Sequence, residues 1–207
     1  TPFVMDARMA NHYSEHKGNK EWLLIAALCR NGKLGNVKHM LNHFGTHRLQ
    51  GDERSYYLHM FLVEACKSGD VQLMHHLCQL FLNPKQIGQN CFVFSLISPI
   101  VCSHQLKSLQ WLHETCDVST EDTQDMLLGE CCRHGWVEGF QFCLSQYGEK
   151  GVFKNDAYQK YFMTTAISRG DDNMVRYLLP MSKDITPTEL FSNALQMVNY
   201  YDPYNNN

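Results

Sequence analysis

Two features that would mark whole classes of protein are missing from this sequence. No run approaches the roughly 20 apolar residues that span a bilayer, so no membrane insertion is expected. Neither sign of charge is in excess: 18 Lys and Arg residues stand against 21 Asp and Glu, which gives a formal net charge of -3. Because nucleic acids and anionic lipids attract clustered basic side chains, we expect no nucleic-acid partner.

Enzyme signatures are missing as well. The sequence has no Gly-rich phosphate loop, no nucleophile elbow and no Cys-x-x-Cys pair. Its acidic pairs, Asp171-Asp172 and Glu121-Asp122, are interpreted as acids at the start of a helix or in a turn. We therefore expect no catalytic residues, no metal and no cofactor.

The chain contains nine cysteines, an odd number. Most of them lie in apolar stretches rather than in loops, where a disulfide framework would place them. We interpret Cys29, Cys66, Cys131 and Cys132 as reduced thiols that pack as small apolar side chains. Reduced thiols indicate a cytoplasmic location.

A period of 31 to 37 residues organises the sequence. Five anchor residues, four Gly and one His, define repeats 1 to 5: Gly32, Gly69, His104, Gly135 and Gly170. A period of this size is the signature of a stacked repeat array. Positions are numbered below from each anchor, so that Arg30 stands at position -2 of repeat 1.

Apolar residues recur at the same positions on both sides of the anchors. Position -7 carries Ile25, Leu62, Ile97, Leu128 and Met163, position -8 carries Leu24, Phe61, Leu96, Leu127 and Phe162, and position +5 carries Val37, Met74, Leu109, Phe140 and Val175. Offsets of three to four residues form one face of a helix, and Gly supplies the left-handed backbone that ends one. Each repeat is therefore predicted to be a helix, a short turn and a second helix.

One helix pair cannot bury both of its apolar faces, so the repeats are expected to stack. The predicted fold is all-α, a solenoid of about five stacked helix-turn-helix repeats in a single domain over residues 1–207. Repeats occupy residues 21–181, capping helices occupy 1–20 and 187–200, and the tail 201–207 frays. Polar links are expected at 45–55, 83–90, 117–123, 148–156 and 182–187.

The repeats resemble the ankyrin repeat. Residues 31–41 and the segment around Gly69 are similar to the second half of that motif, Gly-x-Leu-x-x-Val-x-x-Leu-Leu. Residues 109–114 resemble a divergent subgroup of ankyrin-like repeats that is common in amoebae, their intracellular bacteria and large DNA viruses. The resemblance covers roughly residues 20–180 and implies a host-directed effector in the cytoplasm of a host cell. The Thr-Pro-Leu-His opening of the ankyrin motif is absent, His104 replaces Gly, and Asp172 stands in an apolar column. The alternative is a tetratricopeptide-like array of two-helix repeats, which has a repeat of the same length.

Histidine and cysteine patterns suggest chemistry only weakly. His39, His43 and His47 are four residues apart, as metal ligands on a helix face would be, but they fall outside the core columns and are interpreted as solvated. Cysteine and histidine recur together at Cys102 and His104 and at Cys132 and His134. A reactive thiol needs a base close in space, which the sequence does not place.

Ankyrin geometry would direct the first helices and the links toward a concave binding face. Aromatic and basic residues carry much of the energy in protein interfaces. The candidate partner-binding residues on this face are Trp22, Arg30, Tyr56, Tyr57, His59, Lys67, Phe92, Phe94 and Arg133. Arg30, Lys67 and Arg133 share position -2, where they complement a helix C-terminus or line a mildly basic ridge. Phe92 and Phe94 fit the core equally well, and Trp111 and Trp136 are expected to be packing residues.

Three alternative functions are consistent with this sequence. The first is a protein-protein interaction module that binds a protein or peptide on the concave face of the repeats. The second is a metal- or thiol-dependent enzyme built on a helical solenoid, suggested by nine cysteines and 11 histidines. The third is a structural spacer between domains.

Overall fold

The computed structural model describes residues 20–44, 51–81, 90–116, 118–148 and 156–181, and beyond them only Thr186, Thr188 and Ser192. All regular structure in these residues is helical, with ten α-helices and one 3-10 helix and no strand. The all-α prediction is confirmed. The predicted capping helices lie outside the described residues, apart from Lys20, Thr188 and Ser192; Lys20 is the first residue of the first described helix. Within the described part, no helix is long and apolar enough to cross a membrane.

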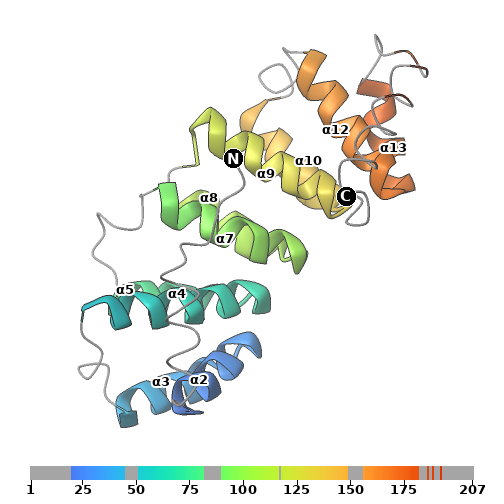
Figure 1. Cartoon of the computed structure of the whole chain (residues 1–207). Helices are drawn as coiled ribbons and strands as arrows, with labels where there is room; N and C mark the ends of the chain where they lie inside the picture. The colour runs from blue at the N-terminus through green and yellow to red at the C-terminus, as the bar shows by residue number, and fades with distance from the viewer. Residues whose placement is uncertain are drawn as a thin grey trace, which may run out of the picture. The chain divides into compact units, whose positions relative to one another are not determined.

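The chain divides into two compact units, Thr1–Asn83 and Pro84–Asn207. Each is described by itself, and the single domain stays a prediction. The N-terminal unit holds the helices of repeats 1 and 2: α2 (Lys20–Arg30), α3 (Leu34–Phe44), α4 (Gly51–Ser68) and α5 (Val71–Phe81). In Figure 1 each first helix lies beside its second helix, and α2 packs on α4.

The C-terminal unit holds the helices of repeats 3 to 5. They are α7 (Asn90–Cys102), α8 (Leu106–Thr115), α9 (Glu121–Arg133), α10 (Val137–Tyr147), α12 (Asp156–Arg169) and α13 (Asp172–Leu178), which continues into the 3-10 helix η2 (Leu179–Met181). The first helices pack in series, α7 on α9 and α9 on α12, and each contacts its own second helix. Within this unit the helix pairs therefore stack.

All five anchors adopt the predicted left-handed backbone. Their φ angles run from 52° at His104 to 73° at Gly69, and His104 is the one residue other than Gly with positive φ in the described chain. Each anchor N–H donates to the carbonyl at position -3, and in four repeats the next N–H reaches back to position -4, as from Trp136 to Cys131 at 2.9 Å. This pair of bonds is the Schellman motif that closes a helix C-terminus.

The predicted core columns are buried with few exceptions. All five residues at position -7 are fully buried, and four of the five at position +5 are. Leu24 departs from its column with an exposed fraction of 49%, although its counterparts Phe61, Leu96, Leu127 and Phe162 are buried. Asp172 is exposed at the start of α13. The predicted packing roles of Trp111 and Trp136 are confirmed.

Four predicted links are shorter than expected because a helix begins inside them or at their last residue. Helix α4 begins at Gly51, α7 at Asn90, α9 at Glu121 and α12 at Asp156. The side chain of Thr120 accepts a hydrogen bond from the N–H of Thr123, which caps α9. Polar composition alone does not distinguish a link from the solvated first turn of a helix.

Candidate functional site

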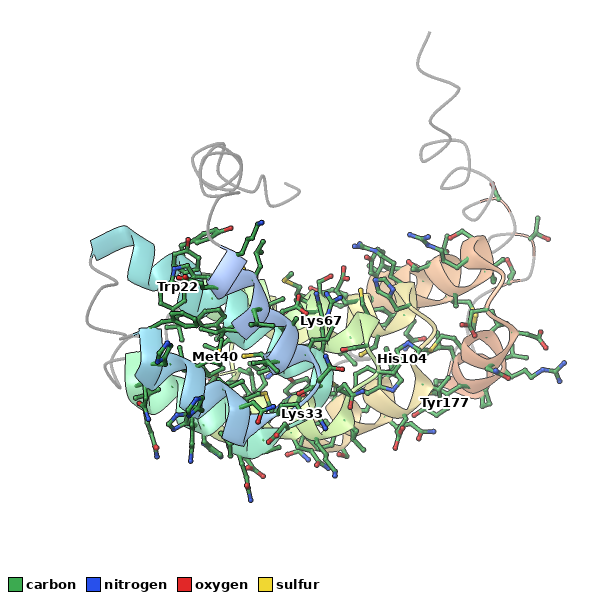
Figure 2. The ribbon with its side chains drawn as sticks, turned by 90° about the horizontal axis from the view of Figure 1, so that it is seen from below. Trp22, Lys33, Met40, Lys67, His104 and Tyr177 are labelled. Atoms are coloured by element: carbon green, nitrogen blue, oxygen red, sulfur yellow. The ribbon has the colours of Figure 1, made fainter. Side chains whose placement is uncertain are left out.

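Two of the predicted contact residues, Trp22 and Tyr57, belong to the core instead. Trp22 has an exposed fraction of 5% and Tyr57 of 4%. The ring of Trp22 lies 5.1 Å from that of Tyr57 and 6.2 Å from that of Phe61, between centroids, and Phe44 lies 6.4 Å away (Figure 2). The prediction that Trp22 and Tyr57 face a partner is wrong, because the apolar stripe of the first helices continues one turn further toward their N-termini.

The other aromatic and imidazole candidates offer little free surface. Tyr56, His59 and Phe94 are half-buried, and the side chain of Phe92 lies outside the described set. Burial lowers the pKa of His59 below its ordinary value, because a low-polarity surrounding disfavours the charged imidazolium. The neutral imidazole is thus the form that the folded chain favours.

The basic candidates of the N-terminal unit meet one carboxylate. Glu64, at position -5 of repeat 2, pairs with Arg30 of repeat 1, and its Oε1 lies 2.8 Å from Nζ of Lys67. Arg30 is 62% exposed, Lys67 32% and Glu64 14%, by side chain. We call Arg30, Glu64 and Lys67 the arginine cluster; it ties α2 to α4.

The arginine cluster combines two cations with one carboxylate. Partial burial alone would raise the pKa of Glu64, but hydrogen bonds and charge from Arg30 and Lys67 outweigh it and hold that pKa below its ordinary value. The carboxylate therefore stays charged at neutral pH and orders both cations. The mildly basic ridge predicted here is a mixed-charge surface.

The C-terminal unit carries a counterpart at the same positions of repeats 3 and 4. Glu130 at position -5 of repeat 4 pairs with Arg133 and lies 3.5 Å, through Oε2, from Nε2 of His134. Cys102 stands at position -2 of repeat 3, where repeat 1 has Arg30, and its Sγ lies 3.3 Å from Nε2 of His134. We call Cys102, Glu130, Arg133 and His134 the thiol cluster.

The two units also differ where a turn meets the next repeat. A Cβ added to Gly32 would lie 3.5 Å from Asp70 of repeat 2, an ordinary contact. A Cβ added to Gly135 would lie 1.6 Å from Oδ2 of Asp171 of repeat 5. Both aspartates cap a second helix, through Leu73 N–H at 3.0 Å and Met174 N–H at 2.9 Å. The Asp171 carboxylate therefore occupies the space that Gly135 leaves.

A second group of sulfur and nitrogen atoms lies where α8, α9 and α10 meet; Cys131 and Cys143 are buried, and His113 and Tyr147 are half-buried. The Cys131 thiol hydrogen-bonds to the sulfur of Cys143, which lowers the pKa of Cys143 against the opposing effect of burial, and His113 lowers it further. The same bond raises the pKa of Cys131. His113 Nε2 lies 3.0 Å from the Tyr147 hydroxyl. The polar atoms of this group therefore find partners within it.

The remaining cysteine and histidine patterns form no metal centre among the residues that the structure covers. His39 and His43 are exposed, with stacked rings 6.5 Å apart, and His47 lies outside the description. In the described chain no three His, Cys, Asp or Glu side chains gather as metal ligands would. Cys29, Cys66, Cys131 and Cys132 are buried free thiols, as predicted.

Sequence reasoning missed both carboxylates, Glu64 and Glu130. A signal was present, because each stands three residues before a basic residue, Lys67 or Arg133, on the same helix. The contacts of Glu64 with Arg30 and of His134 with Cys102 join different repeats. They depend on the packing of neighbouring first helices, which no spacing within one repeat indicates.

Comparison with protein-family profiles, with curated proteins and with solved structures finds no match to this chain. The structure by itself defines an all-α protein of paired helices.

Proposed function

We propose that this chain is a noncatalytic protein-binding module of ankyrin-like helix-turn-helix repeats, which contacts a protein or peptide through the ends of its first helices. The observation that carries the proposal is the arginine cluster. It presents two cations on neighbouring first helices, held by one carboxylate, and Arg30 is largely exposed.

An ordered guanidinium is well suited to recognition. Arg presents a rigid planar fork of donors that matches carboxylates and carbonyl oxygens, and a side chain already held in place loses less entropy on binding. The mixed charge of the cluster favours a protein partner that offers an acid to Arg30 or Lys67 and a donor to Glu64.

The resemblance to ankyrin-like proteins of amoebae, their intracellular bacteria and large DNA viruses supports the finer part of the proposal. A solenoid of such repeats offers an extended surface, and a host-directed effector in the cytoplasm is the role that this resemblance favours. The residues left as candidates are Arg30, Lys67, Arg133, Tyr56, His59, Phe94 and Phe92, whose side chain lies outside the described set.

Partner capture by the full chain tests the proposal. Immobilised wild-type protein, Arg30→Ala and Lys67→Ala are compared by quantitative mass spectrometry of the proteins that they retain. We expect each substitution to weaken capture of a specific partner by about tenfold, as loss of an interface Arg often does. Lys38→Ala, an exposed cation on α3, is the matched control and should retain the partner.

Equal capture by all four proteins would show that the arginine cluster is not the contact surface. Absence of any specific partner would favour the spacer instead. Helix content by circular dichroism confirms that each variant is folded before capture is compared.

A further inference from the structure

Cys102 differs from every other cysteine whose side chain the structure describes. It is exposed at the last residue of α7, whereas Cys29, Cys66, Cys78, Cys116, Cys131, Cys132 and Cys143 are buried. Thiol reagents need access to sulfur, and buried thiols are inert until the fold opens. Access alone would make Cys102 an ordinary surface thiol, but its neighbours add more.

An imidazole lies against this sulfur. Nε2 of His134 is 3.3 Å and Nδ1 is 3.8 Å from Sγ of Cys102, so the sulfur lies beside the ring and Nε2 is the nearer nitrogen. A neutral imidazole nitrogen accepts the proton of an S–H at this distance. A nucleophile within hydrogen-bond reach of a base, which is itself oriented by a third group, is the arrangement that activates cysteine.

Glu130 places a carboxylate beside the same nitrogen, where it stabilises the imidazolium that forms when Nε2 takes the proton. Its Oε2 lies 3.5 Å from His134 Nε2, while its Oε1 is held by Arg133. The His134 backbone N–H also donates to the Glu130 carbonyl at 3.0 Å. Ser98 Oγ lies 3.7 Å from the same sulfur.

We propose that Cys102 is a modification site that undergoes thiol-disulfide exchange with a low-molecular-weight disulfide such as glutathione disulfide. His134 takes the proton from Cys102. The thiolate attacks one sulfur of the disulfide, a new S–S bond forms to Cys102, and the original S–S bond breaks. The departing thiolate takes the proton from His134 and leaves as a thiol. Cys102 is oxidised, and one sulfur of the small molecule is reduced.

The product places a charged peptide at position -2 of repeat 3. That position holds Arg30 and Lys67 in repeats 1 and 2, so the modification adds bulk and charge at the repeat position that carries the cations of the proposed function. This consequence for partner binding rests on the proposed function. The exchange reaction itself does not, and it is measured without a partner.

The reaction is followed on the reduced full chain incubated with glutathione disulfide. Intact mass reports the number of glutathionyl groups added, and peptide mapping reports their position. We expect one group to be added first, at Cys102, and reducing agent to remove it. His134→Gln, which keeps a polar side chain but removes the base, should slow the addition by about tenfold. Cys102→Ser should abolish the first addition.

The N-terminal unit supplies a matched control. Arg30→Cys in a Cys102→Ser background puts a thiol at position -2 of repeat 1, beside a carboxylate and a cation, Glu64 and Lys67. Ser68 stands where repeat 4 has His134. This thiol should react about as slowly as Cys102 in His134→Gln. Adding Ser68→His should restore part of the rate.

Three results would overturn the proposal. They are a first addition that maps to another cysteine, a rate unchanged in His134→Gln, and a cysteine introduced at position 30 that reacts as fast as Cys102 without an added imidazole. Circular dichroism before and after the reaction shows that the fold is intact. A failed partner capture leaves these rates unaffected, so the two proposals fail separately.

Discussion

The arginine cluster and the thiol cluster occupy equivalent positions of the two units and differ in chemistry. Each has a carboxylate at position -5, Glu64 or Glu130, with a cation three residues later on the same helix. In the N-terminal unit Arg30 of the preceding repeat pairs with Glu64. In the C-terminal unit Cys102 of the preceding repeat contacts His134. Two differences in the repeat pattern, Arg30 against Cys102 and Ser68 against His134, thus exchange an inter-repeat ion pair for a thiol beside an imidazole.

The comparison shows how a repeated frame separates folding from function. The left-handed anchors and the buried columns recur in both units. Position -2 is outside those columns, and its side chain is free to vary without opening the core. Variation at such positions is what gives repeat proteins different surfaces on one scaffold.

The largest expected difference between the units lies at their turns. Gly135→Ala forces a Cβ into the Asp171 carboxylate, which has to leave the N-terminus of α13. We expect it to lower the free energy of unfolding by about 2–3 kcal/mol, the sum of a left-handed non-Gly residue and a lost cap. Gly32→Ala, with only an ordinary contact to Asp70, should cost about 1 kcal/mol.

Urea titrations followed by circular dichroism measure both losses. A double-mutant cycle sharpens the comparison: in an Asp171→Ala background, Gly135→Ala should cost no more than Gly32→Ala does. Equal losses for the two glycine variants in the wild-type background would contradict this account of the turn.

A smaller difference is expected when the two carboxylates are neutralised. Glu64→Gln removes a charge that joins two repeats and should lower the free energy of unfolding by about 1 kcal/mol at pH 7, since Arg30 is largely solvated. Glu130→Gln, whose ion pair lies within one helix, should cost about 0.5 kcal/mol.

Acidification checks the same substitution. The pKa of Glu64 is lower in the folded chain than its ordinary value of 4.5, so the unfolded chain binds the proton more readily. The stabilisation from Glu64 is therefore present above pH 4.5 and is lost as the pH falls below it. Glu64→Gln should show a shallower acid loss than wild type, and an unchanged slope would show that the cluster contributes no stability.

The smallest effect is expected at His104, the one anchor that is not Gly. Its left-handed backbone costs about 1 kcal/mol relative to Gly, but its ring stacks on Trp136 with centroids 5.6 Å apart and planes 3° from parallel (Figure 2). Because stacking is worth about as much, His104→Gly should change the free energy of unfolding by less than about 0.5 kcal/mol.

His104→Ala is the matched control. It keeps the backbone cost and loses the ring, so it should lower the free energy of unfolding by about 1 kcal/mol. A loss as large in His104→Gly as in His104→Ala would mean that the backbone conformation costs nothing at this turn. The same urea titrations measure both variants.

The sequence predicts the parts of this fold that repeat. We could predict the buried columns at positions -7 and +5 and the left-handed turn at His104 because the same pattern occurs in five copies, so that an exception in one copy does not hide it. Trp22 could have been placed in the core, since it stands three and seven residues before Ile25 and Cys29 on one face of α2. The thiol cluster could not, because Cys102 and His134 are 32 residues apart and meet only through helix packing.

Because these cysteines are buried, the reactivity of their thiols reports whether the surrounding structure is folded. Cys29, Cys66 and Cys78 belong to the N-terminal unit, and Cys116, Cys131, Cys132 and Cys143 to the C-terminal unit. Each buried thiol becomes reactive only when its own surroundings open. A brief pulse of alkylating reagent, read out peptide by peptide, therefore records which unit has opened and when, without any probe added to the protein.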